Sequence, residues 1–147
     1  YNRRHGMFTL REWFSRSRRY GNQFALVYFD LNGLKVVNDR YGHQAGDLLL
    51  RSVVNSVNSL LREADVLFLR GGDEFMIIFP ETDKKGAYIC VERMKQVVSD
   101  ITIVDKKTSF AYGIVHSSDD YPDMEDMLHS ADVSMYECKR KMKEGER

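Results

Sequence analysis

Two glycines followed by two carboxylates lie between two apolar segments, and no other feature constrains the fold as much. The apolar segments are residues 66–69 and 75–79, and the turn between them contains Gly71, Gly72, Asp73 and Glu74. Glycine permits positive φ angles and lets a ligand approach the backbone closely. Adjacent carboxylates repel each other and cost stability unless a cation lies between them. An ordinary hairpin uses Asn-Gly or Asp-Gly without a second acid. The pattern therefore predicts a β-hairpin with a divalent metal ion at its tip.

A second acidic segment lies earlier in the chain. Residues 24–29 form a continuous apolar run that ends at Asp30. A run without alternation predicts a strand that is buried on both faces. A glycine-containing turn and a helix start follow, and the amides at a helix start face anions. With Lys35 as an added positive charge, this segment predicts a place for a metal-bound phosphate.

The composition is that of one globular domain. The 147 residues are 43% hydrophobic and 30% charged. The 22 basic and 22 acidic side chains cancel, so bulk charge attracts neither nucleic acid nor a membrane surface. Cys90 and Cys138 lack metal-ligand spacing, which indicates a reducing, cytoplasmic setting. We therefore expect no nucleic-acid partner and no membrane contact by this segment.

Apolar periodicity and turn residues predict the order of elements. Helices are expected at residues 8–20, 34–41, 45–61, 84–98 and 124–143, and strands at 23–30, 65–69, 74–79 and 109–116. Thr9 is expected near the start of the first helix, and Pro80 is expected to end the second strand of the hairpin. No linker divides the sequence, so one α+β domain is predicted over residues 1–147, with a central sheet flanked by helices.

The two acidic segments together resemble the GGDEF domain of bacterial diguanylate cyclases. Residues 29–47, which begin Phe-Asp-Leu-Asn-Gly-Leu-Lys, are similar to the first signature of that family, and residues 71–75, Gly-Gly-Asp-Glu-Phe, match its second. The resemblance implies a ferredoxin-like palm with a mainly antiparallel sheet, similar to adenylyl cyclase catalytic domains. The chain begins at Tyr1 without a methionine, and it resembles one domain of a longer multidomain signalling protein whose full length can be membrane-anchored.

The resemblance also implies an activity. It is the condensation of two GTP into cyclic di-GMP and two pyrophosphates, by two-metal phosphoryl transfer between two facing copies of the domain. Two Mg²⁺ or Mn²⁺ ions per site would be bound by Asp30, the Leu31 carbonyl, Asp73 and Glu74. Asp73 would lie nearest the attacking hydroxyl, Glu74 would support the metal site, and Lys35 would offset transition-state charge.

Further positions match GTP contacts of the family. Asn38 and Asp47 stand where the family reads guanine, and their carboxylate and amide groups suit the hydrogen-bonding edge of that base. His43 either lines the base pocket or is a structural residue of its turn. The remaining implied GTP contacts are Gly33, Leu34, Gly71, Gly72, Lys139 and Lys143. Lys139 matches a lysine that reaches the terminal phosphate, and Lys143 stands where the family often has arginine.

An Arg-x-x-Asp pattern precedes the hairpin. In the family, this pattern five residues before Gly-Gly is the inhibitory site for cyclic di-GMP, and here it is formed by Arg62 and Asp65. Arg93 is placed to assist from the next helix. Read without the resemblance, the same residues are a charged connection between a helix and a strand.

Three alternative functions remain open. A cyclase that makes a mixed guanine–adenine dinucleotide is disfavoured by Asp47, because a carboxylate pairs poorly with adenine. A catalytically weak module that senses GTP or cyclic di-GMP is disfavoured by the intact second signature, and a pure scaffold leaves the clustered charges without a purpose. The chain departs from the family at Asn32, Gly33, Leu69, Arg70, Met142 and Lys143. We expect these departures to affect phosphate affinity and turnover rather than the type of reaction.

Overall fold

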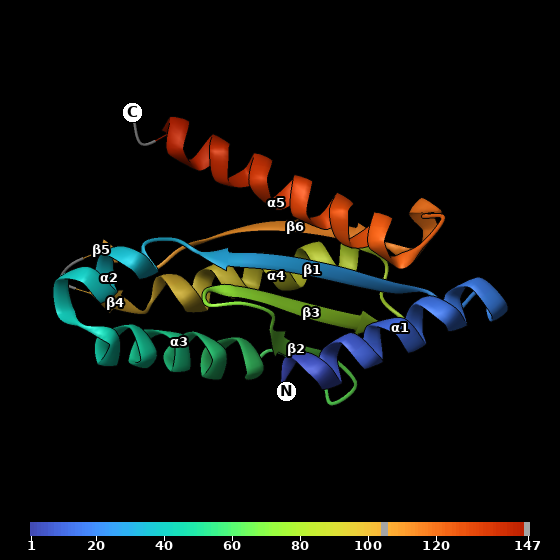
Figure 1. Ribbon diagram of the computed structural model, residues 1–147, viewed down its shortest axis with the longest axis horizontal. Coiled ribbons are helices and arrows are strands. Elements are labelled where there is room, and N and C mark those ends of the chain that lie inside the picture. Colours follow the sequence, from blue (N-terminus) through green and yellow to red (C-terminus); the bar gives the residue numbers. More distant parts are fainter. Residues whose placement is uncertain (104–105, 146–147) are drawn as a thin grey trace.

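The chain forms a four-stranded antiparallel sheet with helices on both faces. A computed structural model describes residues 1–103 and 106–145. The main elements are α1 (Arg3–Tyr20), β1 (Phe24–Leu31), α2 (Leu34–Tyr41), α3 (His43–Asn58), β2 (Val66–Leu69), β3 (Glu74–Pro80), α4 (Lys84–Ser99), β6 (Phe110–His116) and α5 (Met124–Gly145). The strand order is β2-β3-β1-β6, and every pairing within this sheet is antiparallel. The predicted α+β architecture is confirmed (Figure 1).

Strand β1 lies in the interior of the sheet, and all eight of its residues are buried. One face of the sheet packs against α3 and α4, and the other packs against α1 and α5. Because both faces are covered, the strand contains apolar side chains at successive positions instead of alternating with polar ones. The prediction of a strand buried on both faces is therefore confirmed, and it places Asp30 near the end of the strand.

The first helix begins earlier than the sequence predicted. The helix α1 starts at Arg3, because the side chain of Asn2 accepts a hydrogen bond from the backbone N–H of His5 and caps the helix. Thr9, expected near the helix start, lies within the helix, and its hydroxyl donates to the carbonyl of His5. The prediction missed this first turn because it has no apolar periodicity, although Asn is a typical capping residue.

Other differences are confined to boundaries and small elements. Helix α3 starts at His43 instead of residue 45, directly after Gly42, which adopts a φ of 90°. A two-stranded ribbon, β4 (Thr102–Ile103) with β5 (Lys106–Lys107), and the short 3₁₀ helix η1 (Ser117–Asp119) were not predicted. Elements of two or three residues are too short for a periodic signal. No helix in the described part of the chain is both long enough and apolar enough to cross a membrane.

Candidate functional site

The antiparallel register brings the two acidic segments together. Asp30, the seventh residue of β1, lies opposite Glu74, the first residue of β3. At the same place the backbone N–H of Leu31 donates to the carbonyl of Asp73, at 3.1 Å. The hairpin tip is thereby fixed against the end of β1.

The hairpin turn does not use glycine as the sequence analysis expected. The residues described with positive φ do not include Gly71 or Gly72. A Cβ at Gly71 would lie only 3.1 Å from a carboxylate oxygen of Glu74, whereas Gly72 has open space around it. The lack of a side chain at Gly71 therefore leaves room for the Glu74 carboxylate to approach the backbone. Neither glycine is needed here to reach a positive φ angle. The amides of Arg70 and Gly71 both donate to the Glu74 carbonyl and close the turn.

Asp30 is a buried carboxylate with an unusual environment. It is only 5% exposed, and its Oδ2 accepts a hydrogen bond from Nζ of Lys139 on α5, at 2.9 Å. Its Oδ1 is buried and has no hydrogen-bond partner among the described residues. Burial raises the pKa of Asp30 to about 6, Lys139 opposes that increase, and the nearby Asp73 adds to it. Conversely, the bond to Asp30 raises the pKa of Lys139.

The third acid, Glu74, is engaged elsewhere. Its Oε2 accepts a hydrogen bond from the hydroxyl of Tyr28, at 2.9 Å. Burial, together with this bond, raises the pKa of Tyr28 well above its usual value. The guanidinium of Arg70 lies over the Tyr28 ring, 5.5 Å from its centroid. The sequence predicted no role for Tyr28, because this residue lies inside an apolar run, and it identified Arg70 only as a departure from the family pattern. The available signal was the position of Tyr28 two residues before Asp30, which places both side chains on one face of the strand.

The donor set fits a hard divalent cation. Among the described residues, no three acidic, histidine or cysteine side chains converge as a preformed metal cluster. However, the unpartnered Oδ1 of Asp30 and the adjacent Asp73 provide carboxylate oxygens. Mg²⁺ is typically bound by one or two carboxylates, with waters and substrate phosphates as its other ligands. Asp30 and Asp73 would supply two carboxylates of this type, and the Leu31 carbonyl would supply a further oxygen.

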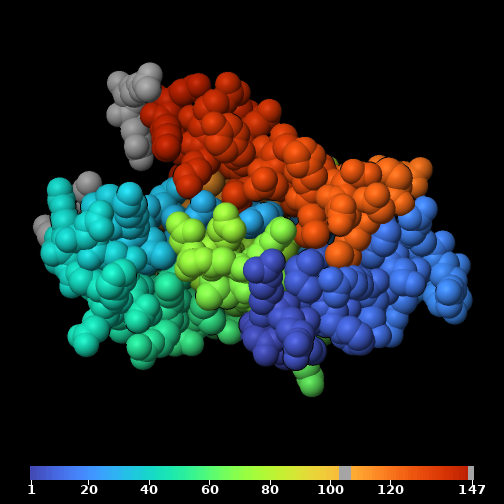
Figure 2. All heavy atoms as spheres, in the orientation of Figure 1, coloured from blue at the N-terminus to red at the C-terminus, as the bar shows by residue number. Residues whose placement is uncertain are grey.

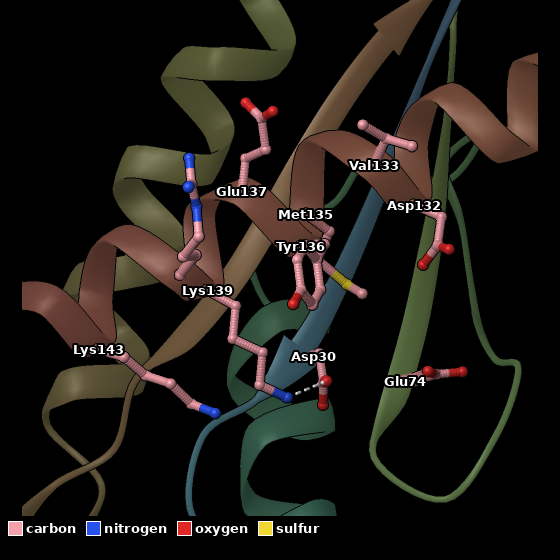
Figure 3. Close-up of a pocket in the computed structure, with 10 residues that line it drawn as sticks. Asp30, Glu74, Asp132, Val133, Met135, Tyr136, Glu137, Lys139 and Lys143 are labelled. Atoms are coloured by element: carbon pink, nitrogen blue, oxygen red, sulfur yellow. Dashed lines mark hydrogen bonds and ion pairs between the residues drawn. The ribbon is translucent and has the colours of Figure 1, made fainter.

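A cavity of about 900 Å³ opens between α5 and the ends of β1 and β3. Figure 2 shows the surface hollowed beneath α5, and Figure 3 shows the side chains that line the cavity. They are Asp30, Glu74, Asp132, Val133, Met135, Tyr136, Glu137, Lys139, Arg140 and Lys143. The predicted Lys139 and Lys143 are both in this set. Arg140, which the sequence analysis did not single out, adds a third cation from the same helix. The volume is within the range of small-molecule sites.

The guanine-reading candidates lie on α2 and α3. A Cβ at Gly46 would overlap the Oδ1 of Asn38, so the amide of Asn38 packs directly against α3 beside Asp47. Asp47 and His43 are exposed in the first turns of α3. The structure therefore brings Asn38 and Asp47 together, although neither lines the 900 Å³ cavity.

The loop from β1 to α2 positions the remaining phosphate candidates. Gly33 adopts a φ of 82° at the start of α2, a conformation that favours glycine. Leu34 is buried, and Lys35 is exposed in the first turn of the helix. Asn32 donates through its side-chain amide to Ser109 Oγ at 3.0 Å, which ties this loop to the start of β6.

Arg62 and Asp65 form a compact ion pair before β2. Their Nη2 and Oδ1 atoms are 3.0 Å apart, and the backbone N–H of Arg62 donates to Oδ2 of Asp65. The same Nη2 also donates to the Pro80 carbonyl and to Thr82 Oγ1. These bonds connect the start of β2 to the end of β3, which is the opposite end of the hairpin from Asp73.

The third predicted member of that cluster, Arg93, lies nearby on α4. Burial raises the pKa of the Cys90 thiol, Asp65 adds to the increase, and Arg93 and Arg62 oppose it. Cys90 on α4 is therefore close enough to all three charged groups to be influenced by them.

Comparisons with known proteins agree on one family. Residues 1–145 match the family model described as "Diguanylate cyclase, GGDEF domain". Diguanylate cyclase DgcP of Escherichia coli is 30% identical over 145 residues, which are 95% of this chain and 42% of DgcP. The cyclic di-GMP phosphodiesterase PdeR of the same organism is 34% identical over 121 residues, which are 80% of this chain and 18% of PdeR. The chain thus spans less than half the length of these relatives.

Solved structures show the same fold. The GGDEF domain of YfiN (TpbB) from Pseudomonas aeruginosa superposes with a TM-score of 0.87 and 28% identity, over 96% of this chain and 91% of that one. Diguanylate cyclase SiaD of the same organism, solved with its activator SiaC, gives a TM-score of 0.86 and 28% identity, over 95% of this chain and 55% of SiaD.

Proposed function

Because the chain belongs to the GGDEF family of diguanylate cyclases, we propose that it condenses two GTP into cyclic di-GMP and two pyrophosphates. The observation that carries this proposal is the buried Asp30 beside Asp73, with an unpartnered carboxylate oxygen in the wall of a cavity to which α5 contributes Lys139, Arg140 and Lys143. Burying a carboxylate is costly unless a cation or donor compensates, so such an arrangement is typical of a functional site.

Two Mg²⁺ or Mn²⁺ ions would be held by Asp30, Asp73, the Leu31 carbonyl and Glu74. When bound, such ions polarise phosphoryl oxygens and acidify a hydroxyl. Lys139, Arg140 and Lys143 would bind the triphosphate from α5, and Lys35 would add charge from α2. In the free protein Lys139 donates to Asp30, so it is already directed toward the place where negative phosphate oxygens would lie.

The chemistry needs two facing domains. The 3′-oxygen of each GTP would attack the α-phosphorus of the GTP held by the other copy. The bond from that phosphorus to pyrophosphate breaks as the proton leaves the hydroxyl near Asp73. Val36, Tyr41 and Leu48 are 54%, 47% and 63% exposed beside the guanine candidates, and apolar side chains of this kind support contact with a second copy.

Guanine would be read by Asn38 and Asp47. A carboxylate accepts from the N1–H and amino groups of guanine, which adenine does not offer in the same pattern. The contact of Asn38 with Gly46 supports this proposal, because it holds the two polar groups on adjacent turns of α2 and α3. We place the reaction in the cytoplasm, where GTP is available, and residues 1–147 would act there as one domain of a longer signalling protein.

Incubation of concentrated protein with GTP and Mg²⁺ tests the proposal. Mass spectrometry of the product is expected to give cyclic di-GMP, with a rate that rises more steeply than linearly with protein concentration. An equimolar mixture of GTP and ATP is expected to give the same product. A mixed dinucleotide would favour the alternative cyclase, and absence of any product at high concentration would overturn the proposed activity.

The second candidate is a catalytically weak module that binds GTP or cyclic di-GMP. Two observations favour it. Lys139 donates a hydrogen bond to the Asp30 carboxylate that would bind the metal ion, and no three acidic side chains form a metal cluster among the described residues. Similarity to PdeR, named as a phosphodiesterase, is consistent with a GGDEF domain in another role. Nucleotide binding without product formation in the incubation above would support this candidate.

We also propose that cyclic di-GMP binds at Arg62, Asp65 and Arg93. Arginine stacks on bases and pairs with phosphate, and a carboxylate accepts from guanine. The ligand would have to compete with Pro80 and Thr82 for the Nη2 of Arg62. The seven residues of β3 separate this cluster from Asp73 by about 20 Å, so product and GTP would not overlap.

A further inference from the structure

We propose that Tyr28, supported by Arg70, holds Glu74 away from Asp30 and Asp73, and that Glu74 must leave Tyr28 to bind a metal ion. Tyr28 would thereby set the metal affinity of the site as a positioning residue. This inference rests on the proposed metal-dependent function, and its test is designed so that the two can fail separately.

The register gives Glu74 two neighbours. Asp30 lies directly opposite on β1, and Tyr28 lies diagonally, two residues earlier on the same face of the sheet. A carboxylate avoids another carboxylate and accepts readily from a hydroxyl, so Glu74 binds the Tyr28 hydroxyl at 2.9 Å. In Figure 3 the Glu74 side chain lies apart from the dashed Asp30–Lys139 contact.

The acidic site is consequently incomplete. Asp30 has Lys139 on one oxygen and no partner on the other. No third acidic side chain joins Asp30 and Asp73 in a metal cluster within the described residues, although Glu74 begins the neighbouring strand. The bond to Tyr28 explains why Glu74 does not complete the group.

Glu74 has space to move between two positions. It lines the 900 Å³ cavity, and it also lines a second cavity of about 560 Å³ between α1, α5 and the hairpin. Tyr28 and Arg70 line only the second cavity, whereas Asp30 lines only the first. Glu74 therefore stands in the wall between the cavities, and rotation of its side chain exchanges a hydroxyl partner for a metal site.

Arg70 fixes the hydroxyl in place. Its guanidinium lies over the Tyr28 ring at 5.5 Å, a distance typical of a cation–π contact. Its backbone N–H also donates to the Glu74 carbonyl at 2.9 Å, so Arg70 contacts both partners of the bond. The ring of Tyr28 is only 4% exposed, which leaves it few alternative orientations. Arg70 is also among the positions at which the chain departs from the usual family pattern.

Removing the Tyr28 hydroxyl should therefore tighten metal binding. A hydrogen bond to a charged group must be broken when Glu74 moves to the metal, and its loss in Tyr28→Phe removes that cost. We expect the variant to bind Mn²⁺ about five- to tenfold more tightly than the wild type. Mn²⁺ binding without nucleotide is measured by electron paramagnetic resonance, so the readout does not depend on activity.

Tyr121→Phe is the matched control. The hydroxyl of Tyr121 also donates to a carboxylate, that of Asp119, but it lies in the loop before α5. Its removal should leave Mn²⁺ affinity unchanged. When Tyr28→Phe is added to Glu74→Gln, the affinity for Mn²⁺ should likewise not increase. The glutamine released from Tyr28 has no carboxylate with which to bind the ion. Unchanged or weaker Mn²⁺ binding by Tyr28→Phe alone would overturn the inference.

The wild-type protein provides an independent measurement. With ¹³C-labelled tyrosine, the Cζ resonance of Tyr28, assigned from the Tyr28→Phe spectrum, should shift on addition of Mg²⁺ because the hydroxyl loses its acceptor. Saturable Mg²⁺ binding without that shift contradicts the inference and leaves the proposed function intact. If neither Mg²⁺ nor Mn²⁺ binds the wild type, the metal site of the proposed function fails as well.

Discussion

Asp30 combines burial, a lysine partner and an acidic neighbour in one carboxylate. Its pKa is raised from 3.8 to about 6, so the fold favours the protonated form relative to the unfolded chain. The group contributes fully to stability below about pH 4, and that contribution is lost as the pH rises through 6.

We therefore expect Asp30→Asn to change the pH profile of stability in metal-free buffer. Between pH 4 and 7 the wild type should lose up to about 3 kcal/mol of unfolding free energy relative to the variant, because each pKa unit corresponds to about 1.4 kcal/mol. Urea unfolding at several pH values measures the difference. Asp126→Asn, an exposed acid on α5, is the control and should follow the wild type. If the stability of Asp30→Asn showed the same pH dependence as that of the wild type, the pKa of Asp30 would not be raised by the fold.

Asp73→Asn tests the catalytic assignment at the same scale. The amide lacks the charge to hold a metal ion near the attacking hydroxyl, so the rate of cyclic di-GMP formation should fall at least about 100-fold. The fold should persist, because relief of carboxylate repulsion does not remove packing. Product is quantified by chromatography and folding by circular dichroism, with Asp126→Asn again as the control. Near-normal turnover would remove Asp73 from the catalytic set.

At the scale of elements, the helices α2 and α3 pack together and carry the two residues proposed to read guanine. Gly46 lets the two helices approach so closely that the Asn38 amide occupies the space of a side chain. The sequence suggested both polar positions through the family resemblance, but it gave no indication of this contact. Periodicity locates a helix, whereas the packing of two helix ends depends on tertiary structure.

Asp47→Ala is expected to reduce the preference for GTP over ATP. A site that pairs with the donors of a base rejects a base without them by up to about 10⁴-fold in favourable cases, and the variant should lose most of that ratio. Competition binding with both nucleotides measures it. Gly46→Ala should act in the same direction by displacing Asn38. An equal loss of affinity for GTP and ATP would place Asp47 in a structural role instead.

The sequence predicted the strands of the main sheet better than the details of the site. Apolar runs such as residues 24–29 locate buried strands because desolvation dominates their placement. The rotamer of Glu74 depends on Tyr28, 46 residues away in sequence, and could not be read from either segment. The α1 start at Asn2 was missed for a different reason, because capping is a single-residue signal that precedes the periodic part of the helix.

For the molecule as a whole, the proposed catalytic and inhibitory sites lie at opposite ends of the β2–β3 hairpin. Asp73 lies at the tip, and the bonds from Arg62 to Pro80 and Thr82 lie where β3 ends. A ligand at the second end can influence catalysis only through the orientation of domains, since it does not reach the nucleotide.

We accordingly expect cyclic di-GMP to inhibit noncompetitively with respect to GTP. Arg93→Ala should weaken product binding, measured by calorimetry, without lowering activity in the absence of product. It is a cleaner variant than Arg62→Ala, which also removes the guanidinium hydrogen bonds to the buried Asp65 and should destabilise the fold. Wild-type affinity for cyclic di-GMP in both variants would reduce this cluster to a structural connection.

The bond from Lys139 to Asp30 has a practical consequence for anyone who handles the protein. The chain supplies its own counter-ion at the acidic site, so the fold does not rely on an external cation for charge balance. Stripping with a chelator should leave the melting temperature nearly unchanged, in contrast to proteins whose metals are structural. An ion that binds at Asp30 would then have to displace Lys139, and the ammonium group released in this way would be free to pair with the phosphates of the nucleotide.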